Sequence, residues 1–235
     1  MHRLYNTALT PTVLITLVAI ALAGRAPLGA QTTATPTVEA TVDRAVRAYE
    51  GMKSVRATFE QTMVNPLTGK SLVSRGEFLR RSPDLVSVRF TDPEGDRIVA
   101  DGKSLWIYLP STNPGQVIRM PLDASGTGTL DLTAQFLDSP WERYRITDGG
   151  TESVGDRDMR KLTLVPKSAG NLPFTSAIVW VDNGDGTIRQ FEVTNAMGLT
   201  RRVRLLTLEP NAAIDRSAFT FTPPEGVEVF DRTGM

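Results

Sequence analysis

The chain has 235 residues, with 26 basic and 26 acidic side chains, no cysteine and a single histidine, His2. The lack of cysteine excludes disulfides and thiolate metal sites. With no histidine beyond position 2, the chain also lacks the residues for a Ser-His-Asp or Cys-His mechanism and for the usual zinc sites. The balanced charge gives no basic footprint for nucleic acid.

The first 30 residues have the layout of a secretory signal peptide. Arg3 and the N-terminal amine give a positive start, residues 13–23 are apolar apart from Thr16, and small residues follow. A run of about a dozen apolar residues is short for a membrane span. An uncleaved N-terminal anchor is the alternative interpretation. We therefore expect cleavage after Ala23 or Ala30, with 1–30 as the signal peptide and 31–235 as a single exported domain.

An amphipathic helix is predicted at 36–50. Thr35-Pro36 suits a helix start, because proline is favoured at the first helical position, and Gly51 suits its end. Apolar residues recur at helical spacing between these two points: Val38, Val42, Ala45, Val46 and Tyr49. Such a stripe must pack on another part of the fold.

Most of the remaining chain alternates between apolar and polar residues, as strands do. Strands are predicted at 55–63, 72–80, 85–91, 98–109 (around an Asp101-Gly102 turn), 116–120, 144–147, 161–166, 176–182, 187–194 and 199–208, with a short closing strand at 219–222. About ten or eleven antiparallel strands with two helices predict a mainly β fold with some α structure. We expect a strongly curved sheet or incomplete β-barrel.

A second helix is predicted at 130–137, where Leu130, Thr133, Ala134 and Leu137 share one face and Pro140 marks the end. It follows the small, flexible residues 123–128. A helix behind such a hinge suits a movable lid. The pattern is equally consistent with a helix that permanently plugs one end of the barrel.

The acidic residues suggest structural roles rather than chemistry. Asp92, Glu94 and Asp96 form a Pro/Gly-rich corner that is typical of a solvated turn, although paired carboxylates also occur in glycosidases. A carboxylate hydrolase would require two of these residues, or one with Asp101, to face one cleft. The loop 183–186 lacks the length and the terminal Glu of a calcium loop. We therefore expect no catalytic residue, metal or cofactor.

Several motifs, taken in order, resemble the LolA family of periplasmic outer-membrane lipoprotein carriers. The strand with Phe59, Glu60 and Gln61 is similar to the family's opening F-x-Q strand, and 92–110 resembles its signature P…V-x-D-G-x-x-L-W-x-Y-x-P. The helix near 130–137 followed by Trp141 and Tyr144 is similar to the lid segment. Residues 164–167, 185–191 and 219–227 complete a resemblance that spans almost the whole expected mature chain.

The resemblance implies an incomplete barrel, closed by helices, whose apolar cavity holds lipoprotein acyl chains. Cargo would come from an ABC-type releasing complex in the inner membrane and pass to an outer-membrane acceptor, carried by a non-enzymatic periplasmic monomer. Each buried methylene is worth about 0.8 kcal/mol, so a soluble carrier needs such a cavity. The expected cavity residues are Phe59, Met63, Phe78, Val86, Val88 and Phe90, and the expected lid face is Leu130, Ala134 and Leu137. Ordinary core packing would give the same alternation.

One departure from the family concerns the lid latch. The family usually has an arginine before the proline that ends its second strand, and here Ser82 precedes Pro83. Arg80 shares the face of Ser82 by the period-two alternation of a strand. Arg81 would take the role only if a one-residue bulge turned it inward. Both arginines therefore stay open as latch candidates.

A sensor is the alternative function. Envelope-stress regulators with LolA-like domains use a similar fold to bind another lipid or a regulatory protein, usually with a second C-terminal domain. This chain ends soon after Phe230, which favours the carrier.

Overall fold

The computed structural model describes residues 36–122, 130–168 and 172–232. The predicted signal peptide and the predicted hinge at 123–128 lie outside the described residues. Within the described ranges, no helix is long and apolar enough to cross a membrane.

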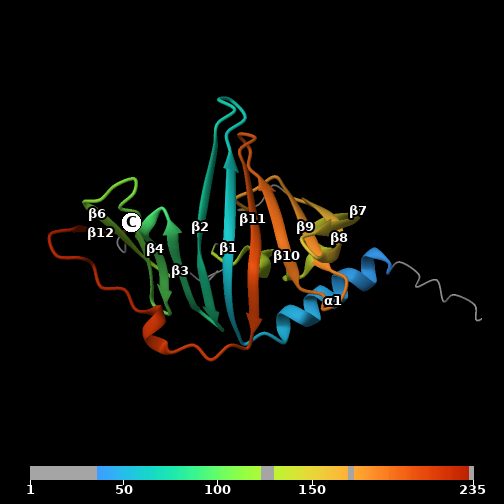
Figure 1. Cartoon of the computed structure of the whole chain (residues 1–235), viewed down its shortest axis with the longest axis horizontal. Helices are drawn as coiled ribbons and strands as arrows, with labels where there is room; N and C mark the ends of the chain where they lie inside the picture. Colours follow the sequence, from blue (N-terminus) through green and yellow to red (C-terminus); the bar gives the residue numbers. More distant parts are fainter. Residues whose placement is uncertain (1–35, 123–129, 169–171, 233–235) are drawn as a thin grey trace, which may run out of the picture. The chain divides into compact units, whose positions relative to one another are not determined.

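Twelve strands form one curved, unclosed sheet in the order β12-β6-β5-β4-β3-β2-β1-β11-β10-β9-β8-β7 (Figure 1). The strands are β1 Ser54–Val64, β2 Ser71–Arg81, β3 Leu85–Asp92, β4 Glu94–Asp101, β5 Ser104–Tyr108, β6 Gln116–Pro121, β7 Tyr144–Val154, β8 Arg157–Pro166, β9 Ser176–Asp182, β10 Ile188–Thr194, β11 Thr200–Pro210 and β12 Glu228–Asp231. The predicted fold class is confirmed, with one strand more than the upper estimate. Every neighbouring pair is antiparallel except β12 and β6, which run parallel.

The sheet register fixes which side chains share a face. Ala57 lies opposite Phe78, and Phe78 lies opposite Val88, so β1, β2 and β3 present these residues on the same side. We call this side the inner face, and the opposite side, which carries Leu79 and Leu85, the outer face. Because successive strand residues alternate, one sheet presents two different apolar surfaces.

The main core lies between the inner face of β8–β11 and the helices. Helix α1 (Val38–Glu50) begins two residues later than predicted, because Thr37 caps it by accepting a hydrogen bond from the Ala40 amide. Helix α2 (Leu132–Leu137) forms most of the predicted lid helix at 130–137, which we call the lid segment, and helix α3 (Pro140–Arg143) follows it. Phe136 is 1% exposed and packs edge-on against Phe174 and Phe191. The apolar stripe of α1 joins this cluster through Val42 and Ala45.

Part of the outer face, on β2, β3 and β5, is covered by the chain's own segment 211–227. The predicted closing strand at 219–222 is wrong, because Phe219 ends a 3₁₀ helix, η1 (Arg216–Phe219). Asp215 caps η1, so local side-chain hydrogen bonding competes successfully with strand formation. Phe219 is 1% exposed and packs with Leu79, Leu85 and Ile214. The next strand is β12, which pairs with β6.

The hairpin of β7 and β8 is longer than predicted. The sequence Asp148-Gly149-Gly150 suggests a break after residue 147, but the structure contains a bulge there, with a register shift between Asp148 and Thr151. Gly150 has φ of +84°, which glycine adopts without strain. The strand therefore continues to Val154.

Candidate functional site

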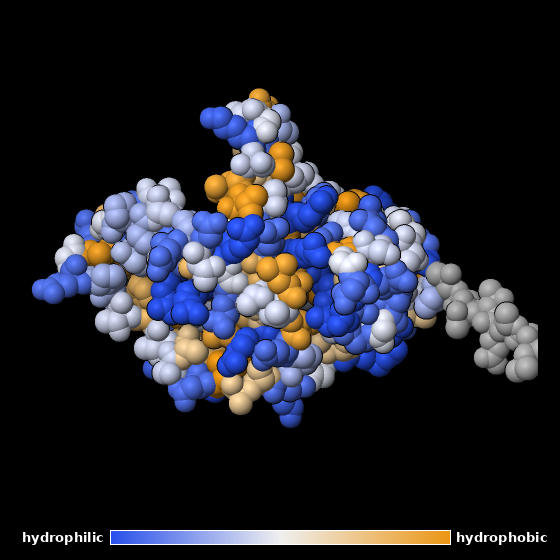
Figure 2. Space-filling view, in the orientation of Figure 1, coloured by the Kyte–Doolittle hydropathy of each residue, from blue (hydrophilic) through white to orange (hydrophobic). Residues whose placement is uncertain are grey.

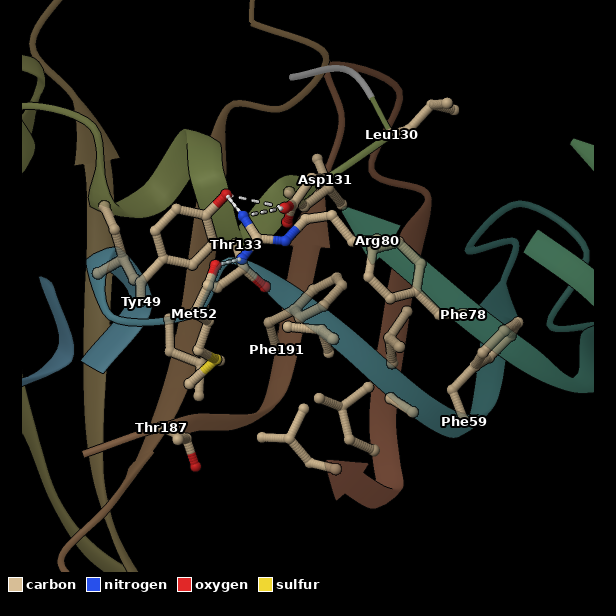
Figure 3. Close-up of a pocket in the computed structure, with 18 of the residues that line it drawn as sticks. Tyr49, Met52, Phe59, Phe78, Arg80, Leu130, Asp131, Thr133, Thr187 and Phe191 are labelled. Carbon is tan, nitrogen blue, oxygen red and sulfur yellow. Dashed lines mark hydrogen bonds and ion pairs between the residues drawn. The ribbon is translucent and has the colours of Figure 1, made fainter. Parts of the chain in front are cut away.

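A cavity of about 100 Å³ lies between the inner face of the sheet, helix α1 and the lid segment (Figure 3). Its wall is mainly apolar and comes from β1–β3, β10 and β11, with residues that include Ala57, Phe59, Phe78, Val88, Phe191, Val203 and Leu205. Typical ligand pockets measure roughly 300–1,000 Å³. The cavity is therefore smaller than a site for several acyl chains requires.

Three of the six predicted cavity residues line this space: Phe59, Phe78 and Val88. Phe90 does not line the cavity, and its ring packs edge-on against that of Phe59 at 5.6 Å between centroids. Val86 is completely buried opposite Arg80, and Met63 lies farther along β1, so neither lines the cavity. All six share the inner face, as the alternation predicts.

Leu130 and Leu137, two of the three predicted lid residues, line the cavity together with Thr133. Ala134 does not, and its amide instead donates to the Asp131 carboxylate at 3.1 Å, which caps helix α2. An aspartate at this position satisfies a backbone donor that the short helix would otherwise leave unpaired. The lid segment therefore places its apolar face over the cavity and has a buried carboxylate at its start.

Arg80 connects the sheet to this carboxylate. Its Nη1 lies 3.6 Å from Oδ2 of Asp131, and its Nη2 donates to the Met52 carbonyl at 2.6 Å. The Tyr49 hydroxyl donates to the same Oδ2 at 2.9 Å, and Arg80 in turn donates to that hydroxyl (Figure 3). Arg80 and Asp131 are each 5% exposed. Strand β2, helix α1 and the lid segment therefore meet in one buried polar cluster, which we call the Arg80 cluster (Tyr49, Arg80 and Asp131).

The protonation of Tyr49 suits this arrangement. Burial raises the pKa of the Tyr49 hydroxyl well above its usual range, the neighbouring Asp131 carboxylate raises it further, and Arg80 acts in the opposite direction. A hydroxyl that stays protonated at neutral pH can donate to Asp131 while it accepts from Arg80. The cluster is thus a connected network around one ion pair.

Of the two latch candidates, the structure places Arg80 at the lid segment and Arg81 elsewhere. Around these residues the pairing of β2 with β3 is regular, with its only shift at Arg75 and Gly76, so no bulge turns Arg81 inward. Arg81 lies on the outer face, where it donates to the Ile214 carbonyl at 3.2 Å and lies over the Phe219 ring.

Sequence reasoning missed Asp131, the contact role of Tyr49, and Arg201, which also lines the cavity. Asp131 had a readable signal, since an aspartate just before an apolar helical run is a typical N-cap. Arg201 also had one, because it alternates with the apolar Val203 and Leu205 on β11. Nothing local indicated that Tyr49 would reach the lid.

The acidic corner has structural partners. Asp96 accepts hydrogen bonds from Ser111, and Asp101 accepts from Lys103, Ser104 and the Trp106 indole. Asp92 lies 3.6 Å from Arg75. Among the described residues there is no group of three or more side chains that could hold a metal ion.

The family model described as "Outer membrane lipoprotein carrier protein LolA" matches residues 50–222. The outer-membrane lipoprotein carrier protein of Cronobacter sakazakii is 31% identical over 183 residues, covering 77% of this chain and 82% of that protein. The protein of the same description from Salmonella paratyphi B is 32% identical over 183 residues, covering 77% and 83%. A solved structure of an uncharacterized conserved protein from Thermus thermophilus has the same fold, with a TM-score of 0.53 at 14% identity, covering 83% of this chain and 98% of that one.

Proposed function

The chain belongs to the LolA family of outer-membrane lipoprotein carriers, and we propose that its inner cavity holds the acyl chains of lipoproteins during their transfer from the inner to the outer membrane. The observation that carries this proposal is the pairing of an apolar cavity with a lid segment attached through one buried ion pair. The cavity contacts are Phe59, Phe78 and Val88 from the sheet, with Leu130 and Leu137 from the lid segment.

The lid opens to admit cargo. The closed cavity, at about 100 Å³, is too small for several acyl chains, whereas the inner face extends beyond it on β3–β6. Along that extension Ile98, Leu105, Ile107, Ile118 and Met120 are partly exposed. Lifting the lid segment joins the cavity to this apolar surface. Burying each methylene there contributes about 0.8 kcal/mol.

Arg80 acts as the latch. Moving the lid segment away separates Arg80 from Asp131, which are both buried when it is closed. The attraction that is lost is largely offset, because both charged groups regain hydration in the open form. A latch of this kind specifies the closed geometry and still allows opening.

The same proposal places the mature protein in the periplasm after cleavage of residues 1–30. It receives cargo from an ABC-type releasing complex in the inner membrane and delivers it to an outer-membrane acceptor, without chemistry of its own. No residue is assigned a catalytic role, and no cofactor is needed.

The test is cargo capture in a lipoprotein-producing bacterium. The full chain is exported, purified without detergent and analysed by mass spectrometry for acylated polypeptides. Ala57→Phe fills the cavity, because Ala57 is fully buried on its wall. The matched control is Leu206→Phe, at an exposed position of neighbouring β11.

We expect bound lipoprotein on the native protein and on the control, and at least a tenfold loss on Ala57→Phe. Circular dichroism establishes that the variant is folded, since overpacking costs about 1–3 kcal/mol. Native preparations that are consistently empty, or cargo undiminished by Ala57→Phe, would contradict the proposal. Capture of a regulatory protein without acyl chains would favour the sensor alternative.

A further inference from the structure

Arg201 places an unpaired cation on the wall of the apolar cavity. It lies on β11 between Met63 of β1 and Val193 of β10, and its side chain lines the cavity. Its Nε donates to Oε1 of Gln61 at 2.5 Å, and Gln61 donates onward to Ser74 at 3.1 Å. Among the described residues, Arg201 has no carboxylate within ion-pair distance, so its only polar partner is a neutral amide.

Other arginines of the inner face do have counter-ions. Arg80 is paired with Asp131, and Arg160 is paired with Asp148. Burial lowers the pKa of Arg201, which reflects the removal of its charge from water. Because a guanidinium stays charged in proteins, a desolvated one without an anion is unfavourable by several kcal/mol. The free protein therefore has an uncompensated charge at a defined place in its cavity.

We propose that Arg201 binds the anionic head group, a carboxylate or a phosphate, of a lipid whose chain lies in the cavity. With Nε engaged by Gln61, the two Nη atoms remain as donors, and guanidinium donors match the oxygens of carboxylates and phosphates. The assignment rests on the acyl-binding function proposed above and adds a polar end to it.

The two arginines mark opposite ends of the cavity. Arg80 lies opposite Val55 on β1, whereas Arg201 contacts Gln61, six residues farther along the strand. At about 3.3 Å per strand residue this is a separation of about 20 Å. A lipid held by its head group at Arg201 would thus extend along β1 toward the lid segment.

The test measures the affinity of the purified mature protein for three probes by calorimetry: oleate, lysophosphatidylglycerol and the neutral methyl oleate. The variants are Arg201→Gln and Arg201→Lys. Arg204→Gln serves as the matched control, because Arg204 lies exposed on the outer face of the same strand. Urea unfolding confirms that each variant is folded.

We expect Arg201→Gln to weaken binding of the anionic probes about 10- to 100-fold, as expected for a hydrogen bond to a charged group. Methyl oleate binding should be unchanged, and Arg201→Lys should give an intermediate loss. Whichever anionic probe binds more tightly identifies the natural head group as a carboxylate or a phosphate. An equal effect on oleate and methyl oleate, or none on either, would overturn the assignment. If the native protein binds neither oleate nor methyl oleate, the proposed acyl-binding function itself fails.

The tips of two neighbouring hairpins form an exposed apolar surface at one end of the sheet. The tips of hairpins β1–β2 and β10–β11 adjoin at one end of the sheet, and the β1–β2 tip projects beyond the neighbouring strands (Figure 1). A Cβ on Gly198 would lie 3.3 Å from Pro66, so the two tips touch. Both expose large apolar side chains: Leu67 at 88%, Met197 at 75%, Leu72 at 62% and Val73 at 41%. Apolar atoms are visible on the projecting hairpin in Figure 2.

The tips carry positive charge. Their turns, residues 65–70 and 195–199, contain Lys70 and no Asp or Glu, whereas Arg75 and Arg202, farther along the hairpins, are paired with Glu60 and Glu192. Lys70 is exposed and makes no ion pair within the described part of the chain. Exposed apolar groups beside a cation match an anionic bilayer, which attracts basic residues to its surface.

We infer that the two tips insert shallowly into the surface of an anionic membrane. The test is co-sedimentation of the mature protein with phosphatidylglycerol or phosphatidylcholine vesicles at low and high salt. Leu67→Glu with Met197→Glu should abolish binding to the anionic vesicles, and Lys70→Glu should weaken it. Leu206→Glu, at an exposed apolar residue outside the tips, should not change it. Equal binding to both lipids, or binding that survives the double substitution, would overturn the inference.

Discussion

The two faces of the sheet are closed in different ways. Over the inner face, the lid segment is attached by the Arg80 cluster and leaves a cavity behind it. On the outer face, segment 211–227 packs Phe219 and Ile214 against Leu79 and Leu85, and Ser54 and Arg81 donate hydrogen bonds to its carbonyls. Adjacent residues of β2 serve the two closures, because Arg80 points inward and Arg81 outward.

Under the proposed function, the outer cover is permanent and the lid segment opens. Exposing Phe219 to water has no compensating gain, since apolar surface is simply rehydrated. Separating Arg80 from Asp131 has such a gain, because both charges recover hydration. Substitutions that weaken one closure at a time therefore test this difference.

The largest effect is expected from Phe219→Ala. Removing an aromatic ring that is 1% exposed should lower the free energy of unfolding by about 3–5 kcal/mol. Urea denaturation gives the value, with Phe230→Ala, at a 43% exposed site, as the control. A loss of about 0.5 kcal/mol or less, within the range of ordinary surface changes, would show that segment 211–227 is as readily lifted as the lid.

A smaller loss is expected from Arg80→Met. Asp131 would be left as an unpaired buried carboxylate, but movement of the lid segment can return it to water, which limits the loss to about 1–3 kcal/mol. Asp131→Asn retains the cap of α2 while removing the charge. In a double-mutant cycle, the two changes together should cost less than the sum of the single changes. Additive losses would argue against coupling between the two groups.

Phe78→Ala should cost still less, about 1–2 kcal/mol, because Phe78 is only partly buried and already borders empty space. In contrast to Phe219→Ala, it should change acyl-chain affinity more than stability. Calorimetry with methyl oleate measures the first quantity and urea denaturation the second. A large loss of stability with unchanged affinity would identify Phe78 as core rather than cavity wall.

Tyr49→Phe should have the smallest effect at neutral pH, about 1 kcal/mol for the lost hydrogen bond. The folded-state pKa of Tyr49 is raised above its ordinary value of 10.0. Its stabilising contribution is therefore complete below that pH and is lost as pH rises toward the folded-state pKa. Unfolding measured from pH 8 to 11 should show a decline that the variant lacks. An identical decline in both proteins would assign it to other groups.

Local sequence pattern was sufficient for much of this architecture. Alternation placed Phe59, Phe78 and Val88 on one face of the sheet. The same rule placed Arg80 on that face and Arg81 on the opposite one. The curved sheet followed from the number of strands. These features depend on neighbours within a few residues, so a single sequence contains them.

Other features depend on contacts between distant segments. Phe219 and Phe221 fit a strand pattern, yet they pack on the outer face, with Phe221 against the rings of Trp106 and Tyr108. The contact of Tyr49 with Asp131 joins residues 82 positions apart. Val86 and Phe90 have the periodicity of cavity residues, but only the packing of neighbouring strands decides that they lie beside the cavity. Alternation predicts which face of the sheet a side chain lies on, but not whether that side chain lines the cavity.

The parallel pairing of β12 with β6 has a consequence for self-association. An edge strand with free backbone donors and acceptors is a template on which further copies can add. Here β6 is covered on that side by four residues of its own chain, Glu228–Asp231, whose charged ends discourage a further strand. Under the proposed function, a carrier whose apolar interior is temporarily vacant is thereby protected from polymerising along this edge of its sheet.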